Sequence, residues 1–184
     1  MRSILTAAAT LAIVGSIVAA GGALASPGSA IMGDPVIGGR AGFTDDVSID
    51  VTVTAEGGEA ETVSVTSGDV IVQRVLVGPG GTTGWHSHPG PAIVTVVAGT
   101  LTLFDGDDTT CTGQDYAAGE AFVDLGSGHV HIGRNLSETD GVQLFVTYLG
   151  VPVGESCRWA RGERRVSARR LPRPCRARAR QALR

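Results

Sequence analysis

From residue 47 onward, hydrophobic and polar residues alternate along the chain. Val47, Ile49 and Val51 are separated by polar residues, and this period of two predicts a β-strand with one buried face. Further short apolar stretches are bounded by the glycine-rich or polar clusters that are typical of turns. The expected strands span residues 47–54, 62–66, 70–77, 85–88, 92–98, 100–104, 121–125, 129–134 and 142–149. The pattern therefore predicts an all-β sandwich or barrel.

The composition agrees with this architecture. The chain has 184 residues, of which 27 are Gly, and 42% are hydrophobic but only 4% aromatic. Such a length suits one domain, and this much glycine excludes a coiled coil or a helical bundle. We expect residues 47–154 to form the barrel domain, preceded by a flexible lead-in over residues 26–46.

The first 25 residues have the organisation of a secretory signal peptide. Arg2 supplies a positive start, residues 4–20 are apolar and uncharged, and Ala23-Leu24-Ala25 is a small-x-small cleavage pattern. We expect cleavage after Ala25 and a secreted, extracytoplasmic protein with no membrane span after processing. An uncleaved anchor is the alternative, since residues 4–25 are long enough to cross a bilayer.

Charge is distributed very unevenly along the chain. Residues 26–154 carry three Arg against sixteen Asp or Glu, a net charge of −13, which argues against a nucleic-acid partner. Residues 155–184 carry eleven Arg and a net charge of +9. We expect this tail to be disordered. It is a basic arm, an unstructured tail, or the product of a reading-frame change in a GC-rich gene.

All four histidines lie in one stretch, between His86 and His131. His86 and His88 are two residues apart in an expected strand, so their side chains should point to one face of the sheet and could grip a metal ion. His129 and His131 repeat this spacing on a later strand. By itself, a His-x-His pair in a strand is more often structural than metal-binding.

The residues around these pairs resemble the two motifs of the cupin superfamily. Gly80, His86-Ser87-His88 and Gly99 fit every spacing of the first motif. The Gly-x-x-His-x-x-x-Asn part of the second motif fits Gly128, His131 and Asn135, with one extra residue and a Gly in place of Pro before it. The resemblance implies a double-stranded β-helix, or jelly-roll barrel, over residues 47–149.

The resemblance also implies metal ligands at His86, His88 and His131. The family's fourth ligand, a glutamate, falls on Ala92, which cannot bind metal. Three neutral imidazoles can still hold a divalent ion such as Zn, Fe, Mn, Ni or Cu, with Mn weakened most by the missing carboxylate. Asp124 or Gln73 could replace the glutamate, but both are expected to be ordinary wall or surface residues.

Other residues near the motifs are expected to have structural roles. Trp85 should pack in the core or at the rim, Asn135 should bond across its turn, and His129 should lie at the rim, with a role behind the metal site as the lesser alternative. Of the three cysteines, Cys111 could pair with Cys157, which leaves Cys175 unpaired. Which two are paired is left open by the sequence.

The sequence predicts a binding barrel and leaves its chemistry open. The first hypothesis is an exported cupin that binds a metal ion and a small organic molecule, as an oxygenase or a lyase if it is an enzyme. The alternatives are a non-catalytic binding protein and a metal-free structural domain. No catalytic residue is assigned, and a homodimer is compatible with the resemblance.

Overall fold

The computed structural model describes residues 28–31, 36–54 and 57–160. The predicted signal peptide and the tail after residue 160 lie outside the described residues. In the described part, the regular elements are β1 (Ser29–Ile31), β2 (Val36–Gly42), β3 (Ile49–Thr54), β4 (Ala60–Val65), β5 (Asp69–Thr82), β6 (His86–Ser87), β7 (Ala92–Ala98), β8 (Thr100–Asp105), β9 (Gln114–Ala117), β10 (Ala121–Asp124), β11 (His131–Arg134), β12 (Val142–Val151) and β13 (Trp159–Ala160). No helix capable of spanning a membrane occurs among them.

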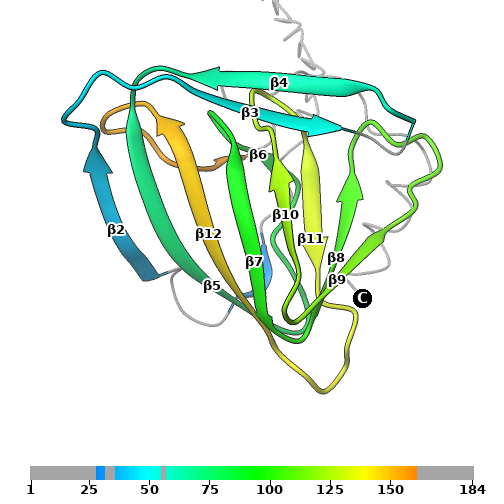
Figure 1. The fold of residues 1–184 in the computed structure, drawn as a ribbon. Helices are drawn as coiled ribbons and strands as arrows, with labels where there is room; N and C mark the ends of the chain where they lie inside the picture. The colour runs from blue at the N-terminus through cyan, green and yellow to red at the C-terminus, as the bar shows by residue number, and fades with distance from the viewer. Residues whose placement is uncertain (1–27, 32–35, 55–56, 161–184) are drawn as a thin grey trace, which may run out of the picture.

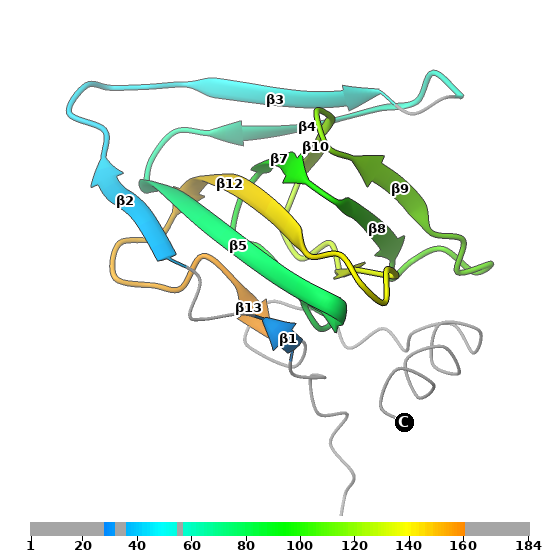
Figure 2. The same ribbon diagram turned by 90° about the horizontal axis from the view of Figure 1, so that it is seen from below.

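Eleven of the strands form one antiparallel sheet that rolls into a nearly closed barrel (Figure 1). Its main path runs β10-β7-β12-β5-β11-β6-β13, with β8 joined to β11 and β9 joined to β8. The hairpin β3-β4 is a separate two-stranded sheet that lies across one side of the barrel (Figures 1 and 2). The prediction of an all-β jelly-roll barrel, or double-stranded β-helix, is confirmed.

Residues that alternate along these strands point in turn to the inner and the outer face of the barrel. In β7 the buried positions are Ala92, Val94 and Val96, and the residues between them are exposed. The neighbouring strands β5 and β12 alternate in the same way and complete one apolar cluster. Each fully buried Val or Leu contributes about 1.5–3 kcal/mol relative to an exposed one, so this cluster holds the barrel together.

The N-terminal segment differs from the flexible lead-in that was expected. Strand β2 pairs with the first half of β5, from Val36↔Arg74 to Gly42↔Asp69, and β1 pairs with the second half. The side chain of Arg40 pairs with Asp69 and donates to the carbonyls of Pro152 and Glu155. These strands satisfy backbone groups along an edge of β5 that would otherwise be open.

The structured part of the chain also extends past the boundary expected at residue 154. Strand β13 pairs with β6, in the register Trp159↔Ser87 and Ala160↔His86. The residues just before it, Cys157 and Arg158, pack against the barrel. The expectation of disorder from residue 155 is therefore wrong for residues 155–160, because this segment completes the sheet beside the histidine strand.

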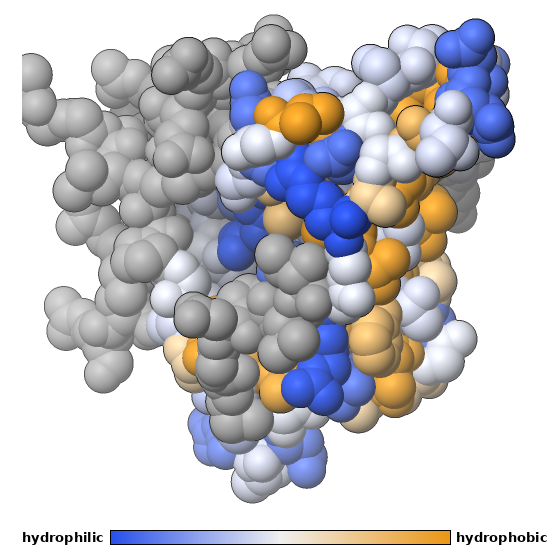
Figure 3. Space-filling model, turned by 90° about the vertical axis from the view of Figure 1, so that its left-hand side faces the viewer, coloured by the Kyte–Doolittle hydropathy of each residue, from blue (hydrophilic) through white to orange (hydrophobic). Residues whose placement is uncertain are grey.

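The face seen from the left-hand side of Figure 1 is a mixed surface. Hydrophilic side chains lie directly beside hydrophobic ones on it (Figure 3). Exposed apolar residues such as Val72 and Phe145 contribute to the outer surface of β5 and β12.

The cysteines do not pair as the sequence suggested. Cys111 is disulfide-bonded, whereas Cys157 is a free, buried thiol. Cys111 packs with Trp85, Phe104 and Ile132 in a small second core, and Cys157 belongs to the main core. Because Cys157 is a free thiol, the pairing Cys111–Cys157 that the sequence left open does not form.

Candidate metal centre

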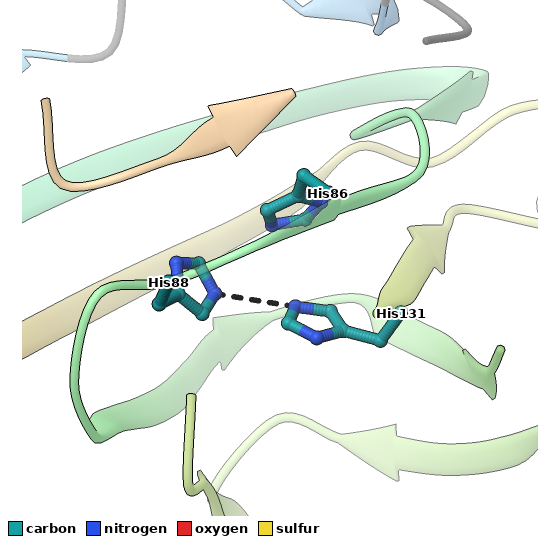
Figure 4. Close-up of side chains that lie close together, drawn as sticks. All are labelled: His86, His88 and His131. Atoms are coloured by element: carbon teal, nitrogen blue, oxygen red, sulfur yellow. Dashed lines mark hydrogen bonds between the residues drawn. The ribbon is translucent and has the colours of Figure 1, made fainter. Parts of the chain in front are cut away.

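The barrel brings three of the four histidines together. His86 lies on β6 directly opposite His131 on β11, and His88 follows two residues later on the same face as His86. The rings of His86 and His131 are 4.4 Å apart, and His88 lies 4.9 Å from each (Figure 4). One nitrogen from each ring falls within 4.8 Å of the others. The cluster expected from the sequence therefore forms, although its metal-binding role stays a prediction.

Two of the three rings are held by backbone carbonyls through Nδ1. His86 Nδ1 lies 2.8 Å from the Gly84 carbonyl oxygen, and His88 Nδ1 lies 3.1 Å from that of Cys157. A carbonyl only accepts hydrogen bonds, so Nδ1 carries the proton in both rings. Each Nε2 is then left with a free lone pair, which is the form of imidazole that binds metal.

The third ring lies against a carboxylate, but among the described residues its Nδ1 meets no acceptor with hydrogen-bond geometry. Asp124 Oδ2 lies 3.0 Å from His131 Nδ1, which favours the proton on that nitrogen and the lone pair on Nε2. His131 Nε2 then faces His88 Nε2 at 3.2 Å. This contact is a hydrogen bond when one of the two Nε2 atoms carries a proton (Figure 4), and it brings two lone pairs together when both protons are on Nδ1. Bonds of about 2.0–2.1 Å to one tetrahedral ion would separate the two nitrogens by about 3.3 Å, so the donor set fits a metal ion.

Burial keeps two of these histidines neutral. It lowers the pKa of His86 well below the usual value, and His131 and Arg158 lower it further. Burial, followed by the neighbouring His131, lowers the pKa of His88 to about 3. Neutral imidazole is the metal-binding form, so these rings are ready to bind an ion at neutral pH without releasing a proton.

Asp124 is buried and faces the barrel interior, although the sequence favoured an ordinary wall or surface position. It lies directly opposite Ala92, where the family's glutamate would be, in the register of β10 and β7. Burial raises the pKa of Asp124, but His131 and His129 outweigh this effect and hold the pKa well below its usual range. A carboxylate therefore remains at this level of the barrel, but it contacts the far side of His131.

The turn after Asp124 explains one departure from the family motif. Gly126 stands where the motif has proline, and its φ is +67°, which proline cannot adopt. A Cβ at this position would also clash with the Gly90 carbonyl. The Gly126 amide donates to Asp124 Oδ1 at 2.8 Å, so this turn fixes the carboxylate that holds His131.

His129 bridges two carboxylates at the edge of the site. Its Nδ1 lies 2.7 Å from Asp124 and its Nε2 lies 2.9 Å from Asp105. Since both nitrogens face acceptors, both carry protons, and the hydrogen bonds to Asp105 and Asp124 raise the pKa of His129 to about 10. His129 thus lies at the rim, as expected, and contacts Asp124, which in turn contacts His131; a role behind a metal site stays a prediction. It also forms a second group with Asp124 and His131.

The three histidines open onto a cavity of about 50 Å³. Its wall is mainly apolar, with Val94, Leu144 and Val146 among the lining residues, and Tyr148, Gln73 and Arg158 add polar groups. The Tyr148 ring lies 4.9 Å from that of His88, and burial raises the pKa of Tyr148. An ion on the histidines would therefore face a small space with a largely apolar wall.

The remaining sequence candidates have structural positions. Gln73 lies in the cavity wall, where its Oε1 is 3.8 Å from Cys157 Sγ. Trp85 is buried in the second core, as expected. Asn135 is buried and donates to the carbonyls of Val77 and Asp140, which ties its turn to β5 as expected.

Two residues of the site were missed in the sequence analysis. Tyr148 has the same parity as Leu144 and Val146 on an expected strand, so alternation could have placed it inside the barrel. Arg158 was grouped with the other arginines of the tail, and no local pattern distinguishes it from them. Only the pairing of β13 with β6 brings Arg158 to the cavity.

Comparison with known proteins gives weak likenesses to barrels of the same kind. No protein-family model and no curated protein sequence matches the chain. A cupin-2 domain protein from Shewanella frigidimarina is 20% identical, with a TM-score of 0.35, over 44% of this chain and 70% of that chain. A cupin-like protein from Thermotoga maritima is 21% identical, with a TM-score of 0.39, over 45% of this chain and 58% of that chain.

A polyketide cyclase from Streptomyces resistomycificus is also similar. It is 20% identical, with a TM-score of 0.39, over 47% of this chain and 62% of that chain. This chain thus spans less than two thirds of the Thermotoga and Streptomyces proteins.

Proposed function

We propose that this chain is an exported barrel protein that binds one divalent transition-metal ion on His86, His88 and His131, with a small organic molecule beside it. The observation that carries the proposal is the arrangement of the three rings. The Nδ1 atoms face two carbonyls and one carboxylate, and the Nε2 atoms of His88 and His131 face each other at 3.2 Å.

The donor set favours borderline metals over hard ones. Imidazole nitrogen suits Zn, Cu, Fe and Ni, whereas Mn prefers the carboxylate that Ala92 does not provide. Asp124 supplies a negative charge behind His131, which makes that imidazole a stronger donor. When bound, such an ion supplies a Lewis acid with open positions for a ligand.

The cavity wall defines the kind of ligand that fits. Its many Val and Leu side chains favour an apolar body, and the ion with the few polar groups would orient it. The wall described here includes no carboxylate, and with its three histidines occupied by the ion it would offer no imidazole as a general base. A metal-dependent lyase or oxygenase would depend on the ion, and a non-catalytic binding protein is the second candidate that this lining favours.

Export is part of the proposal and is supported by two features. The first 25 residues have the organisation of a secretory signal, and Cys111 is disulfide-bonded. Disulfides persist in oxidising compartments outside the cytoplasm. Export would be tested by fractionating cells that express the full chain and by sequencing the mature N-terminus, which we expect at Ser26. Full-length protein retained in the cytoplasm would contradict it.

The metal site is tested by elemental mass spectrometry of the purified protein, before and after incubation with Zn, Fe, Cu, Ni or Mn. We expect about one equivalent of a transition metal in the wild type and almost none in a His86→Ala/His88→Ala variant. A His129→Ala variant distinguishes this site from the group of Asp124, His129 and His131, and it should keep most of its metal if the ion lies on His86, His88 and His131. No metal in the wild type under any of these conditions would overturn the proposal.

A further inference from the structure

Arg158 places a guanidinium group in the wall of the histidine cavity. It lines the same cavity as His86, His88 and His131. Its Nη2 donates to the Thr83 carbonyl at 2.6 Å, whereas its Nε is buried and has no hydrogen-bond partner among the described residues. A buried donor without a partner is unfavourable, so an acceptor that enters the cavity would stabilise this group.

Arg40 offers a comparison, because its guanidinium has a carboxylate and two carbonyl partners. Arg40 pairs with Asp69 and donates to the carbonyls of Pro152 and Glu155. Arg158 has no such carboxylate within the described part of the chain. Burial lowers the pKa of Arg158, and only Tyr148 and Cys157 oppose this effect. A partly buried cation without a counter-ion is unfavourable, and an anion entering the cavity would relieve this cost.

The backbone fixes Arg158 beside the histidine strand. The preceding residue, Cys157, accepts the hydrogen bond from His88 Nδ1, and the following residue, Trp159, pairs with Ser87. Arg158 also lowers the pKa of both His86 and His88, which reflects its closeness to their rings. A ligand held by this guanidinium would therefore lie next to the histidine nitrogens.

We infer that the ligand of this cavity is a small monocarboxylate, bound through its carboxylate by Arg158 and through its apolar body by residues such as Val94, Phe122 and Leu144. A guanidinium matches a carboxylate in shape and charge. Arg158 is the one Lys or Arg among the lining residues described, which suits a singly charged ligand better than a phosphate dianion. The inference deepens the proposed function, but the contact with Arg158 does not require the ion.

The test compares carboxylates with the matching neutral amides. Acetate, butyrate and benzoate, with acetamide, butyramide and benzamide, are titrated at pH 8 into metal-free and zinc-loaded protein by calorimetry. Charge-assisted hydrogen bonds predict that the best-fitting acid binds metal-free wild type about tenfold or more tightly than its amide. The amide series separates recognition of the carboxylate from simple filling of the apolar space.

Three variants assign this preference to Arg158. Arg158→Gln should lose the preference in metal-free protein, and Arg158→Lys, which keeps the charge, should retain part of it. Arg74→Gln makes the same change at an exposed position on β5 and should leave the preference intact. Melting temperature and zinc content are measured for each variant. If Arg158→Gln does not fold, the Lys variant and the wild-type comparison of acids with amides still test the inference.

The outcomes separate the two proposals. Equal affinity for acids and amides in metal-free wild type, or an unchanged preference in a folded Arg158→Gln variant, would overturn the monocarboxylate inference even if zinc binds. Failure to bind any metal, with the acid preference intact and dependent on Arg158, would overturn the metal proposal and support the inference.

Discussion

The pKa of a histidine is lowered in the interior of the barrel and raised at its edge. In the interior, His88 lies among buried side chains and beside His131, and its pKa falls to about 3. At the edge, His129 lies between Asp105 and Asp124, and its pKa rises to about 10. The two imidazoles are chemically identical, so the difference comes from what each one faces. A neutral ring that faces other nitrogens can bind a metal ion, whereas a charged ring that faces two carboxylates stabilises their negative charges.

Asp124 connects these two regions. One of its oxygens lies 2.7 Å from His129 Nδ1 and 3.0 Å from His131 Nδ1. A single buried carboxylate therefore contacts the charged ring at the edge and the ring whose Nε2 faces His88. Substitutions that remove one of these rings or this carboxylate test the difference between the two regions, and so does a change in pH.

The largest effect is expected from His131→Ala, which removes a proposed ligand of the interior cluster. The affinity for zinc should fall by more than about 100-fold. Removing a residue that only contacts a metal ligand lowers affinity by about 10–100-fold, and removing the ligand itself should lower it further. Competition titration against a chelator measures this change. His129→Ala is the matched control, with a loss at least about tenfold smaller. Equal losses of zinc affinity in the two variants would contradict the proposed difference between the two regions.

Asp124→Asn should weaken metal binding by about 10–100-fold, because it removes the carboxylate behind His131. The control is Asp50→Asn, the same change on the separate β3-β4 hairpin. Nitrogen-detected NMR of the imidazoles gives a readout that is independent of affinity, since the proton on His131 Nδ1 should become less favoured. If affinity and tautomer both remain as in the wild type, Asp124 has no positioning role.

The two regions should respond to pH with opposite signs. The pKa of His88 is lower in the fold than the unfolded value near 6.5, so metal-free protein loses stability as pH falls below that value, by about 2 kcal/mol at pH 5. The pKa of His129 is higher in the fold, so its contribution is complete below pH 6.5 and is lost as pH rises toward 10. Because solvent screens this side chain, which is 34% exposed, the contribution of His129 to the free energy of unfolding is about 1–2 kcal/mol.

Urea unfolding from pH 5 to pH 10.5 measures both slopes. His88→Gln should reduce the loss on the acid side alone, where the lowered pKa of His86 also contributes. His129→Gln should reduce the loss on the alkaline side alone, where the raised pKa values of Cys157 and Tyr148 also contribute. Parallel curves for the two variants would show that both histidines share one environment, contrary to the structure.

The smallest effect is expected from Asp105→Asn. The Asp105 side chain is 46% exposed, so its ion pair with His129 should contribute less than about 1 kcal/mol to stability. The pKa of His129 should fall, yet the ring should stay protonated at neutral pH because Asp124 remains. An NMR titration of His129 measures this. A His129 that is neutral at pH 7 in this variant would mean that Asp105, rather than Asp124, controls its charge.

Much of the barrel could be predicted because its signals are local. Short apolar stretches bounded by turn residues identified residues 92–98 and 142–149 as strands, and these became β7 and β12. The spacing of His86, His88 and His131 predicted the cluster that the structure forms. Strands β1, β2 and β13 were missed because they are stabilised by pairing with distant strands and carry little pattern of their own.

The sequence by itself determined the all-β class, the barrel and the identity of the three clustered histidines, because short-range periodicity and motif spacing specify them. Only the tertiary structure decided how those histidines are held. The Cys157 carbonyl, the Asp124 carboxylate and the Arg158 guanidinium reach the site through strand pairing across the barrel. These contacts depend on which distant strands become neighbours, and that choice is set by packing of the whole sheet.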